Sequence, residues 1–161
     1  MLICPNLKKH RTEIYAKIGM IKLEPKYYQS RCSLLPGSSY AEILDAARKA
    51  YKNATNKSRR TPYINSKYKK FKTDKVFLDA FWVHIFQKGR RERSKRLRLY
   101  ECALDLLRNT QMMPEVIDKY NDKLYRFFGV ARTGEKFCVQ VKEEVETGRK
   151  HFMSVFPWNK A

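Results

Sequence analysis

The last forty residues of the chain alternate between apolar and polar side chains with a period of two. The alternation is clearest over residues 136–142, where Phe137, Val139 and Val141 occupy every second position. Similar apolar segments span residues 125–130 and 150–156, and turns that contain glycine, at 132–135 and 146–149, separate the three. Short strands joined by tight turns pair as antiparallel neighbours. This pattern predicts a sheet of three or four antiparallel strands.

Helical spacing precedes these strands. Ser39 and Glu42 form a capping box in front of apolar residues at helical spacing, which predicts a helix that ends near residues 53–56. Two further helices are expected over residues 75–88 and 95–109. Residues 7–21 also have roughly helical apolar spacing. The expected fold class is therefore α+β, with N-terminal helices followed by a three- to four-stranded antiparallel sheet.

A strongly basic segment lies between residues 48 and 75. It holds eleven Lys and Arg residues and one acid, with Tyr51, Tyr63, Tyr68 and Phe71 interleaved. It is either a solvated linker or an arm that contacts RNA, since cations bind phosphates and aromatic rings stack on bases. We place a boundary near Pro62. We expect residues 1–73 to be a helical, basic extension of uncertain role, and residues 74–161 to form the functional domain.

The charge of the chain restricts its partners. Thirty-five Lys and Arg residues against sixteen Asp and Glu residues give a formal net charge of +19. Such an excess implies a polyanionic partner: nucleic acid first, an anionic membrane surface second, or an acidic inhibitor protein. With 161 residues, 43% of them hydrophobic, the chain can form a core, which argues against general disorder. No apolar run is long enough to predict membrane insertion.

The cysteines are scattered. Cys4, Cys32, Cys102 and Cys138 form no C-x-x-C pair and have no histidine at a zinc-site spacing, so we expect neither a metal nor another cofactor. No secretory signal opens the sequence, which favours free thiols in a reducing compartment and action in the cytoplasm. Cys102 and Cys138 lie in apolar patterns and are expected to be small core residues.

His84 is the first candidate for chemistry. It lies in an apolar stretch directly before a dense basic run that begins at Lys88 and includes Arg90 and Arg91. On one helix, Phe77, Phe81, His84 and Lys88 would share a face, and the Lys88 charge would favour a neutral imidazole that can act as a general base. Cations at the phosphate would stabilise the transition state. The alternative is a core histidine beside a solvated basic turn.

The last two strands supply further candidates. Strict alternation in the final strand places Met153, Val155 and His151 on one side, with Phe152, Ser154 and Phe156 on the other. Ser154 between two phenylalanines is typical of a polar group in a partly apolar cleft. It could equally be a small residue that accommodates a neighbouring ring, and Gln140 carries the same ambiguity. His151 is a candidate second acid, although an exposed position is the alternative.

The order of these parts resembles the phage-associated, barnase-like branch of the BECR ribonucleases, a fold that groups barnase, EndoU, colicin-type tRNases and RelE-like toxins. The resemblance covers residues 74–158: a helix with His-Ile, a basic stretch, a second helix, then Tyr-Arg-Phe, Gly-x-x-Phe-x-Val-x-Val-Lys and Phe-Met-Ser-Val-Phe-Pro. It implies RNA cleavage without a metal on the open face of a sheet. His84, Arg126 and Ser154 match family positions, and Lys88 and Gln140 match more weakly.

The sequence therefore predicts a metal-independent endoribonuclease, a toxin or effector that is phage- or mobile-element-encoded and leaves a 2′,3′-cyclic phosphate. The expected catalytic residues are His84, Arg126, Ser154 and Lys88. The expected substrate-binding residues are Arg90, Arg91, Gln140 and His151. RNA is the expected partner, with an acidic inhibitor as a second. The alternative is a non-catalytic RNA- or DNA-binding protein, and an adaptor that binds only an acidic protein is a third reading.

Overall fold

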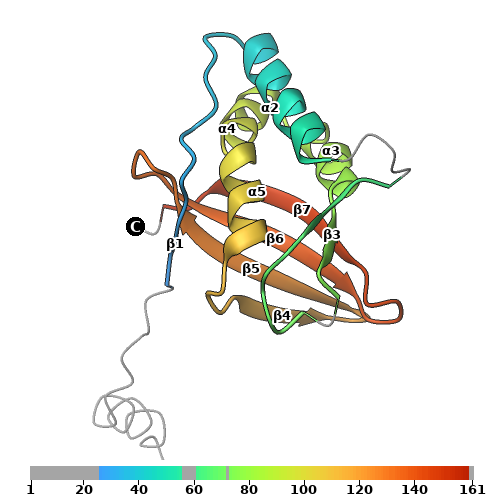
Figure 1. The fold of residues 1–161 in the computed structure, drawn as a ribbon. Coiled ribbons are helices and arrows are strands. Elements are labelled where there is room, and N and C mark those ends of the chain that lie inside the picture. Colours follow the sequence, from blue (N-terminus) through green and yellow to red (C-terminus); the bar gives the residue numbers. More distant parts are fainter. Residues whose placement is uncertain (1–25, 56–60, 72, 160–161) are drawn as a thin grey trace, which may run out of the picture.

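A computed structural model describes residues 26–55, 61–71 and 73–159. These residues form helices that lie together above a curled sheet (Figure 1). The helices are α2 (Tyr40–Ala54), α3 (Asp79–Ile85), α4 (Arg90–Arg98) and α5 (Tyr100–Asn109). The strands are β1 (Tyr28–Gln29), β2 (Tyr63–Asn65), β3 (Lys75–Phe77), β4 (Glu115–Lys119), β5 (Asp122–Val130), β6 (Lys136–Glu144) and β7 (Lys150–Pro157).

The described strands form one mixed sheet of seven strands. Its order is β1-β5-β6-β7-β3-β2, and β4 pairs with β5 as well. β1 runs parallel to β5, and β3 runs parallel to β7, whereas the other pairs are antiparallel. The expected architecture, N-terminal helices followed by a three- to four-stranded antiparallel sheet, is therefore wrong. Strands of two or three residues are too short to show alternation, so β1, β2 and β3 left no periodic signal.

The three C-terminal strands β5, β6 and β7 and their turns are confirmed. The predicted assignment of the β7 side chains to the two faces of the sheet is wrong, because a β-bulge shifts the β6–β7 register between Gln140 and Val141. Phe152 and Val155, each 0% exposed, consequently both lie in the core. His151 and Ser154 lie on the opposite face, next to Lys142 and Gln140 respectively. An extra residue in a strand reverses its alternation, so a strict period of two assigns Phe152 and His151 to the wrong sides.

Some of the helices predicted from the sequence are confirmed and others are not. The capping box at the start of α2 is confirmed, with the Glu42 amide donating to Ser39 Oγ over 3.3 Å. The helix expected over residues 75–88 is instead β3 followed by the short α3, because an apolar segment alone does not distinguish the two periods. The helix expected over 95–109 is divided at Leu99 into α4 and α5.

The core lies between the helices and the upper face of the sheet, which we call the covered face. Phe81 of α3 stacks on Phe152 of β7 with 4.8 Å between ring centroids and 10° between planes. Phe127 and Val139 face the same core from β5 and β6. Burying each large apolar side chain stabilises the fold by roughly 1.5–3 kcal/mol. Gly129 lies where a Cβ atom would come within 2.5 Å of the Phe137 ring, so glycine permits this packing.

Residues on both sides of position 74 contribute to this core. Ile43 of α2 and Ile64 of β2 belong to the same buried cluster as the residues of β5 to β7. Tyr68 and Phe71, at 7% and 9% exposed, pack against Phe127. These two aromatic residues of the basic segment are thus core residues rather than part of an arm that contacts RNA. The helical spacing of residues 7–21 lies outside the described residues.

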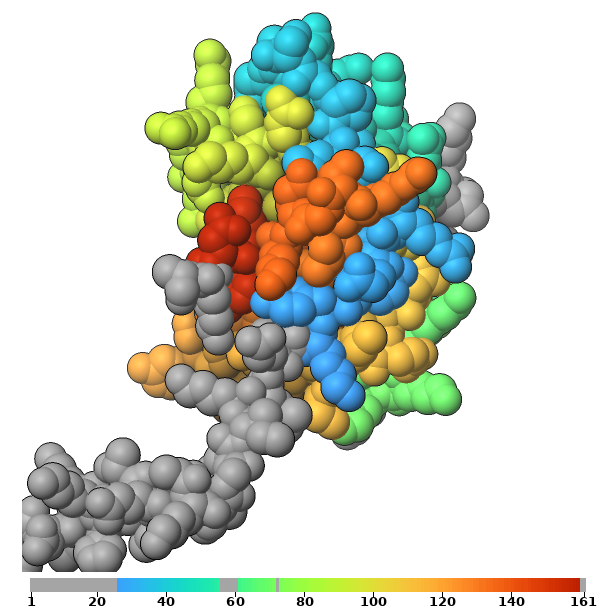
Figure 2. Space-filling view, turned by 90° about the vertical axis from the view of Figure 1, so that its left-hand side faces the viewer, coloured from blue at the N-terminus to red at the C-terminus, as the bar shows by residue number. Residues whose placement is uncertain are grey.

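The segment before α2 contains β1 and packs along one edge of the sheet, where β1 pairs with β5. Figure 2 shows residues 26–39 in blue beside the orange turn that joins β5 to β6. The Ser30 hydroxyl and the Arg31 amide both donate to Asp105 of α5, over 2.8 and 3.0 Å. On the lower face of the sheet, Tyr27 and Trp158 both contact the ring of Phe128. These rings cover the part of the lower face around Phe128, which is 3% exposed. In the described part of the chain, no helix has the length and apolar character needed to cross a membrane.

Candidate functional site

The lower face of the sheet, which we call the uncovered face, carries a cavity of about 480 Å³ over β5, β6 and β7. Leu124, Gln140, Lys142, Ser154 and Phe156 form its floor. His84 and Lys88, together with Arg96 of α4, form one wall, and Lys119, Asp122 and Lys123 of the β4–β5 hairpin form the opposite wall. The cavity therefore brings together side chains that lie more than seventy positions apart in the sequence.

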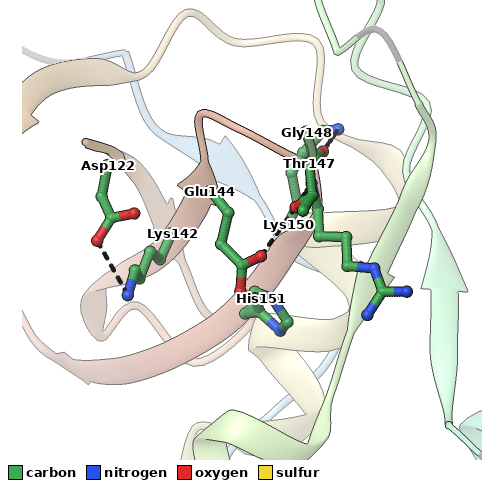
Figure 3. A network of polar contacts seen from close by, with 8 residues as sticks. Asp122, Lys142, Glu144, Thr147, Gly148, Lys150 and His151 are labelled. Carbon is green, nitrogen blue, oxygen red and sulfur yellow. Dashed lines mark hydrogen bonds and ion pairs between the residues drawn. The ribbon is translucent and has the colours of Figure 1, made fainter.

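The cavity has a strongly positive lining. Five of its lining residues are Lys or Arg, against the single acid Asp122, which leaves a formal charge of 5 − 1 = +4 with His84 neutral. Asp122 forms an ion pair with Lys142 at 3.0 Å (Figure 3). The cationic groups in the lining are Lys88, Arg96, Lys119, Lys123 and Lys142. A partly enclosed site with this excess of positive charge is suited to an anion of several charges, such as a phosphodiester with its neighbouring phosphates.

His84 brings a titratable group into this cavity. It lies in the last turn of α3, is half-buried, and its ring forms neither a hydrogen bond nor an ion pair with any described residue. Both ring nitrogens are thus available to a ligand. The expected single helical face of Phe77, Phe81, His84 and Lys88 is wrong, because Phe77 belongs to β3 and Lys88 follows the end of α3. His84 and Lys88 nevertheless line the same cavity.

Arg96 connects α4 to the floor of the cavity. One of its terminal nitrogens donates to Ser154 Oγ over 2.7 Å, and its Nε donates to Glu92 over 3.1 Å. Its guanidinium also lies over the Phe156 ring, 5.4 Å from the centroid. These three contacts hold the planar group in one orientation, so its remaining N–H donors are arranged in advance for an anion. Ser154, expected as a polar group in a cleft, lies beside it.

The other arginines of the basic run have different surroundings. Arg93 donates to the carbonyl oxygens of Lys88 and Phe86, each over 2.6 Å, and so closes the end of α3. Arg98 donates to the carbonyl oxygen of Gly37 over 2.7 Å. Arg90 lies over the Tyr40 ring, and Arg91 is exposed. At 100° per residue, Arg91 faces away from Arg96 on α4, and among the described residues neither Arg90 nor Arg91 lines the cavity.

Arg126 lies beside the cavity rather than in its wall. Arg126, Gln140 and Ser154 are direct cross-strand neighbours on β5, β6 and β7, so they form one row on the uncovered face. Gln140 and Ser154 line the cavity, whereas Arg126 does not belong to the lining that the described residues form. The Nε atom of Arg126 is buried and has no hydrogen-bond acceptor among the described residues. Arg126, expected to be catalytic from the resemblance, thus lies next to the cavity and outside its lining.

His151 lies outside the cavity lining, next to Lys142. Its Nε2 atom is 3.0 Å from Glu144 Oε1, and Figure 3 shows this pair beside the Asp122–Lys142 pair. A hydrogen bond from the Thr147 hydroxyl and the neighbouring His151 lower the pKa of Glu144, so its carboxylate is charged at neutral pH. A charged carboxylate at this distance orients the imidazole ring.

Several cavity residues were not found by sequence reasoning. Arg96 is one of several cations in the basic run after His84, and nothing in that run distinguishes it before the orientation of α4 is known. Lys119, Asp122 and Lys123 belong to the β4–β5 hairpin, whereas the first predicted strand begins only at residue 125. Lys142 was assigned to the face opposite Val141, which is correct, but without a role.

The described residues hold no cluster of three or more His, Cys, Asp or Glu side chains that could bind a metal ion. The buried thiols are also poorly suited to chemistry, because burial raises the pKa values of Cys102 and Cys138 to about 12. Both are 0% exposed, as expected for small core residues. The cavity's own titratable and cationic groups are therefore the candidates for chemistry in this region.

Comparisons of this chain with protein-family models, with curated proteins and with solved structures found no match.

Proposed function

We propose that this chain is a metal-independent endoribonuclease. The observation that carries the proposal is the cavity itself, whose lining combines the unengaged ring of His84 with a fixed Arg96 guanidinium and four lysines. A phosphodiester bound to these cations would lie within the same space as a group that can accept a proton. The net charge of +19 supports RNA as the polyanion and an acidic inhibitor as a second partner.

The reaction starts with the 2′-hydroxyl of the nucleotide bound in the cavity. His84 takes its proton, the 2′-oxygen forms a bond to the adjacent phosphorus, and the bond from phosphorus to the 5′-oxygen breaks. The products are a 2′,3′-cyclic phosphate and a 5′-hydroxyl, which receives its proton from the Lys88 ammonium group. Arg96 and Lys142 stabilise the negative charge that collects on the phosphoryl oxygens. Ser154 and Gln140 orient the phosphate and the base from the floor of the cavity.

The test is cleavage of labelled RNA in EDTA by the wild type and by His84→Gln, which keeps a polar side chain but removes the titratable ring. We expect a loss of about 100-fold or more in cleavage rate, with RNA affinity almost unchanged. Lys49→Ala is a suitable control, because Lys49 is exposed on α2 and, among the described residues, pairs with Asp45 alone. Equal losses of cleavage and affinity in His84→Gln would contradict the catalytic role.

The second candidate function is a nucleic-acid-binding protein without catalysis, which the positive cavity lining alone would favour. Its signature is RNA that stays intact but shifts on a gel in a salt-dependent manner. Cyclic phosphate ends produced by the wild type and not by His84→Gln separate the two functions. Action in the cytoplasm and an origin in a phage or mobile element are parts of the nuclease proposal. A result that refutes the nuclease would refute them as well.

A further inference from the structure

The uncovered face continues beyond the cavity toward the other edge of the sheet. The register aligns four side chains across four strands: Lys142 of β6, His151 of β7, Phe77 of β3 and Tyr63 of β2. Their neighbours Val76 and Ile64 point into the core, so these four side chains point away from it. Lys142 also lines the cavity. With about 4.8 Å between strands, the row extends roughly 14 Å from the cavity.

The three rings of this row lie next to one another. The Phe77 centroid is 5.8 Å from that of His151, with 34° between the planes, and 5.9 Å from that of Tyr63, with 74° between them. All three side chains are half-buried, so each presents part of its ring at the surface. The Glu144 carboxylate fixes the His151 ring from the side. A sheet surface with aromatic rings on adjacent strands is a platform on which unpaired bases can stack.

Positive groups accompany the rings. Lys75 precedes Phe77 by two residues on β3, so it shares the uncovered face. Arg149 directly precedes β7, and its guanidinium reaches the same face over the Phe77 ring. The Lys75 ammonium lies 4.8 Å from the Tyr63 centroid, and the Arg149 guanidinium lies 5.8 Å from that of Phe77. Both residues are exposed. Both cations lie over the ring faces, so a stacking base takes their place there and the displaced side chains contact the neighbouring phosphates.

We propose that His151, Phe77 and Tyr63 form a base-stacking subsite for single-stranded RNA that leaves the cavity across β7, β3 and β2. This inference rests on the proposed function, because the cavity is the starting point of the path. Stacking requires unpaired bases, and bases inside a duplex are already stacked on each other. The charge of Lys75 and Arg149 selects a polyanion over an apolar peptide as the occupant of this face. The chain thus binds several unpaired nucleotides of single-stranded RNA next to the phosphodiester bond that lies in the cavity.

The experiment measures binding of a labelled octanucleotide with 2′-O-methyl sugars, which cannot be cleaved by 2′-hydroxyl attack. Phe77→Leu keeps an apolar side chain of similar size and removes the aromatic ring. We expect it to weaken binding about tenfold, and to leave a dinucleotide analogue, which fills only the cavity, unaffected. Phe86→Leu is the matched control, because Phe86 is an exposed phenylalanine that follows α3, away from the uncovered face.

Duplex RNA of the same sequence should bind more weakly than the single strand and should not respond to Phe77→Leu. Equal octanucleotide affinities for the wild type, Phe77→Leu and Phe86→Leu would overturn the subsite. If cleavage by the wild type persisted in that case, the nuclease proposal would stand without it. Conversely, ring-dependent binding in a protein that cleaves no RNA would support the subsite and refute the nuclease.

Discussion

The two faces of the central strands differ although their residues alternate along the same backbone. On the covered face, Phe127, Val139 and Val155 are cross-strand neighbours and almost completely buried. One position along each strand, Arg126, Gln140 and Ser154 form the parallel row on the uncovered face and stay partly accessible. The first row stabilises the fold, and the second presents polar groups to a ligand. A substitution on the covered face should therefore change stability, and a substitution at the next residue of the same strand should change ligand binding or catalysis.

The largest effect should follow from a change on the covered face. Phe152→Ala removes a fully buried ring that stacks on Phe81, and we expect a loss of about 3–5 kcal/mol in the free energy of unfolding. Urea denaturation followed by circular dichroism measures it. Gln140→Ala on the uncovered face should cost less than about 1 kcal/mol in the same assay. Similar losses in the two variants would remove the distinction between the faces.

The next effect should be on catalysis rather than stability. Arg96→Ala removes a cation that is fixed by Glu92 and Ser154, and we expect about a 100-fold lower rate of RNA cleavage. Arg91→Ala removes the same charge from the far side of α4 and should reduce the rate much less. Cleavage rates at saturating RNA, together with melting temperatures, make the comparison. Equal rate losses would show that the charge of α4 matters and the position of Arg96 does not.

The smallest effect concerns Lys150, a buried charged side chain on the covered face. Lys150 is 1% exposed, donates to the Thr73 hydroxyl over 2.8 Å, and lies over the Phe71 ring. Burial lowers its pKa, so between that lowered pKa and 10.5 the unfolded chain binds more protons than the folded protein. Stability should therefore rise with pH in this window. Lys150→Met removes the titrating group and should lose this rise.

The measurement is the unfolding free energy of the wild type minus that of Lys150→Met between pH 7 and 10.5. The difference should shift in favour of the wild type as the pH increases. A constant difference would mean that the ammonium group is as well solvated in the folded protein as in the unfolded chain.

How far the sequence predicts this fold depends on the length of each element. The long strands β5, β6 and β7 and the capped helix α2 were predicted, because each contains enough residues to show its period or its cap. β3 is three residues long, and its apolar residues continue into α3, so the two were read as one helix. The bulge opposite Gln140 was not predicted either, since an inserted residue leaves the local composition unchanged.

For the candidate site, the sequence by itself determined which residue types were available: His84 in an apolar segment, a dense basic run, and polar residues between the phenylalanines of the last strand. Only the tertiary structure decided which of them meet. The orientation of α4 selects Arg96 over Arg91, the β4–β5 hairpin adds its lysines, and the pairing of β3 with β7 brings Phe77 next to His151. Sequence patterns report the exposure of a side chain on its own element, whereas a site depends on the packing between elements that are distant in the chain.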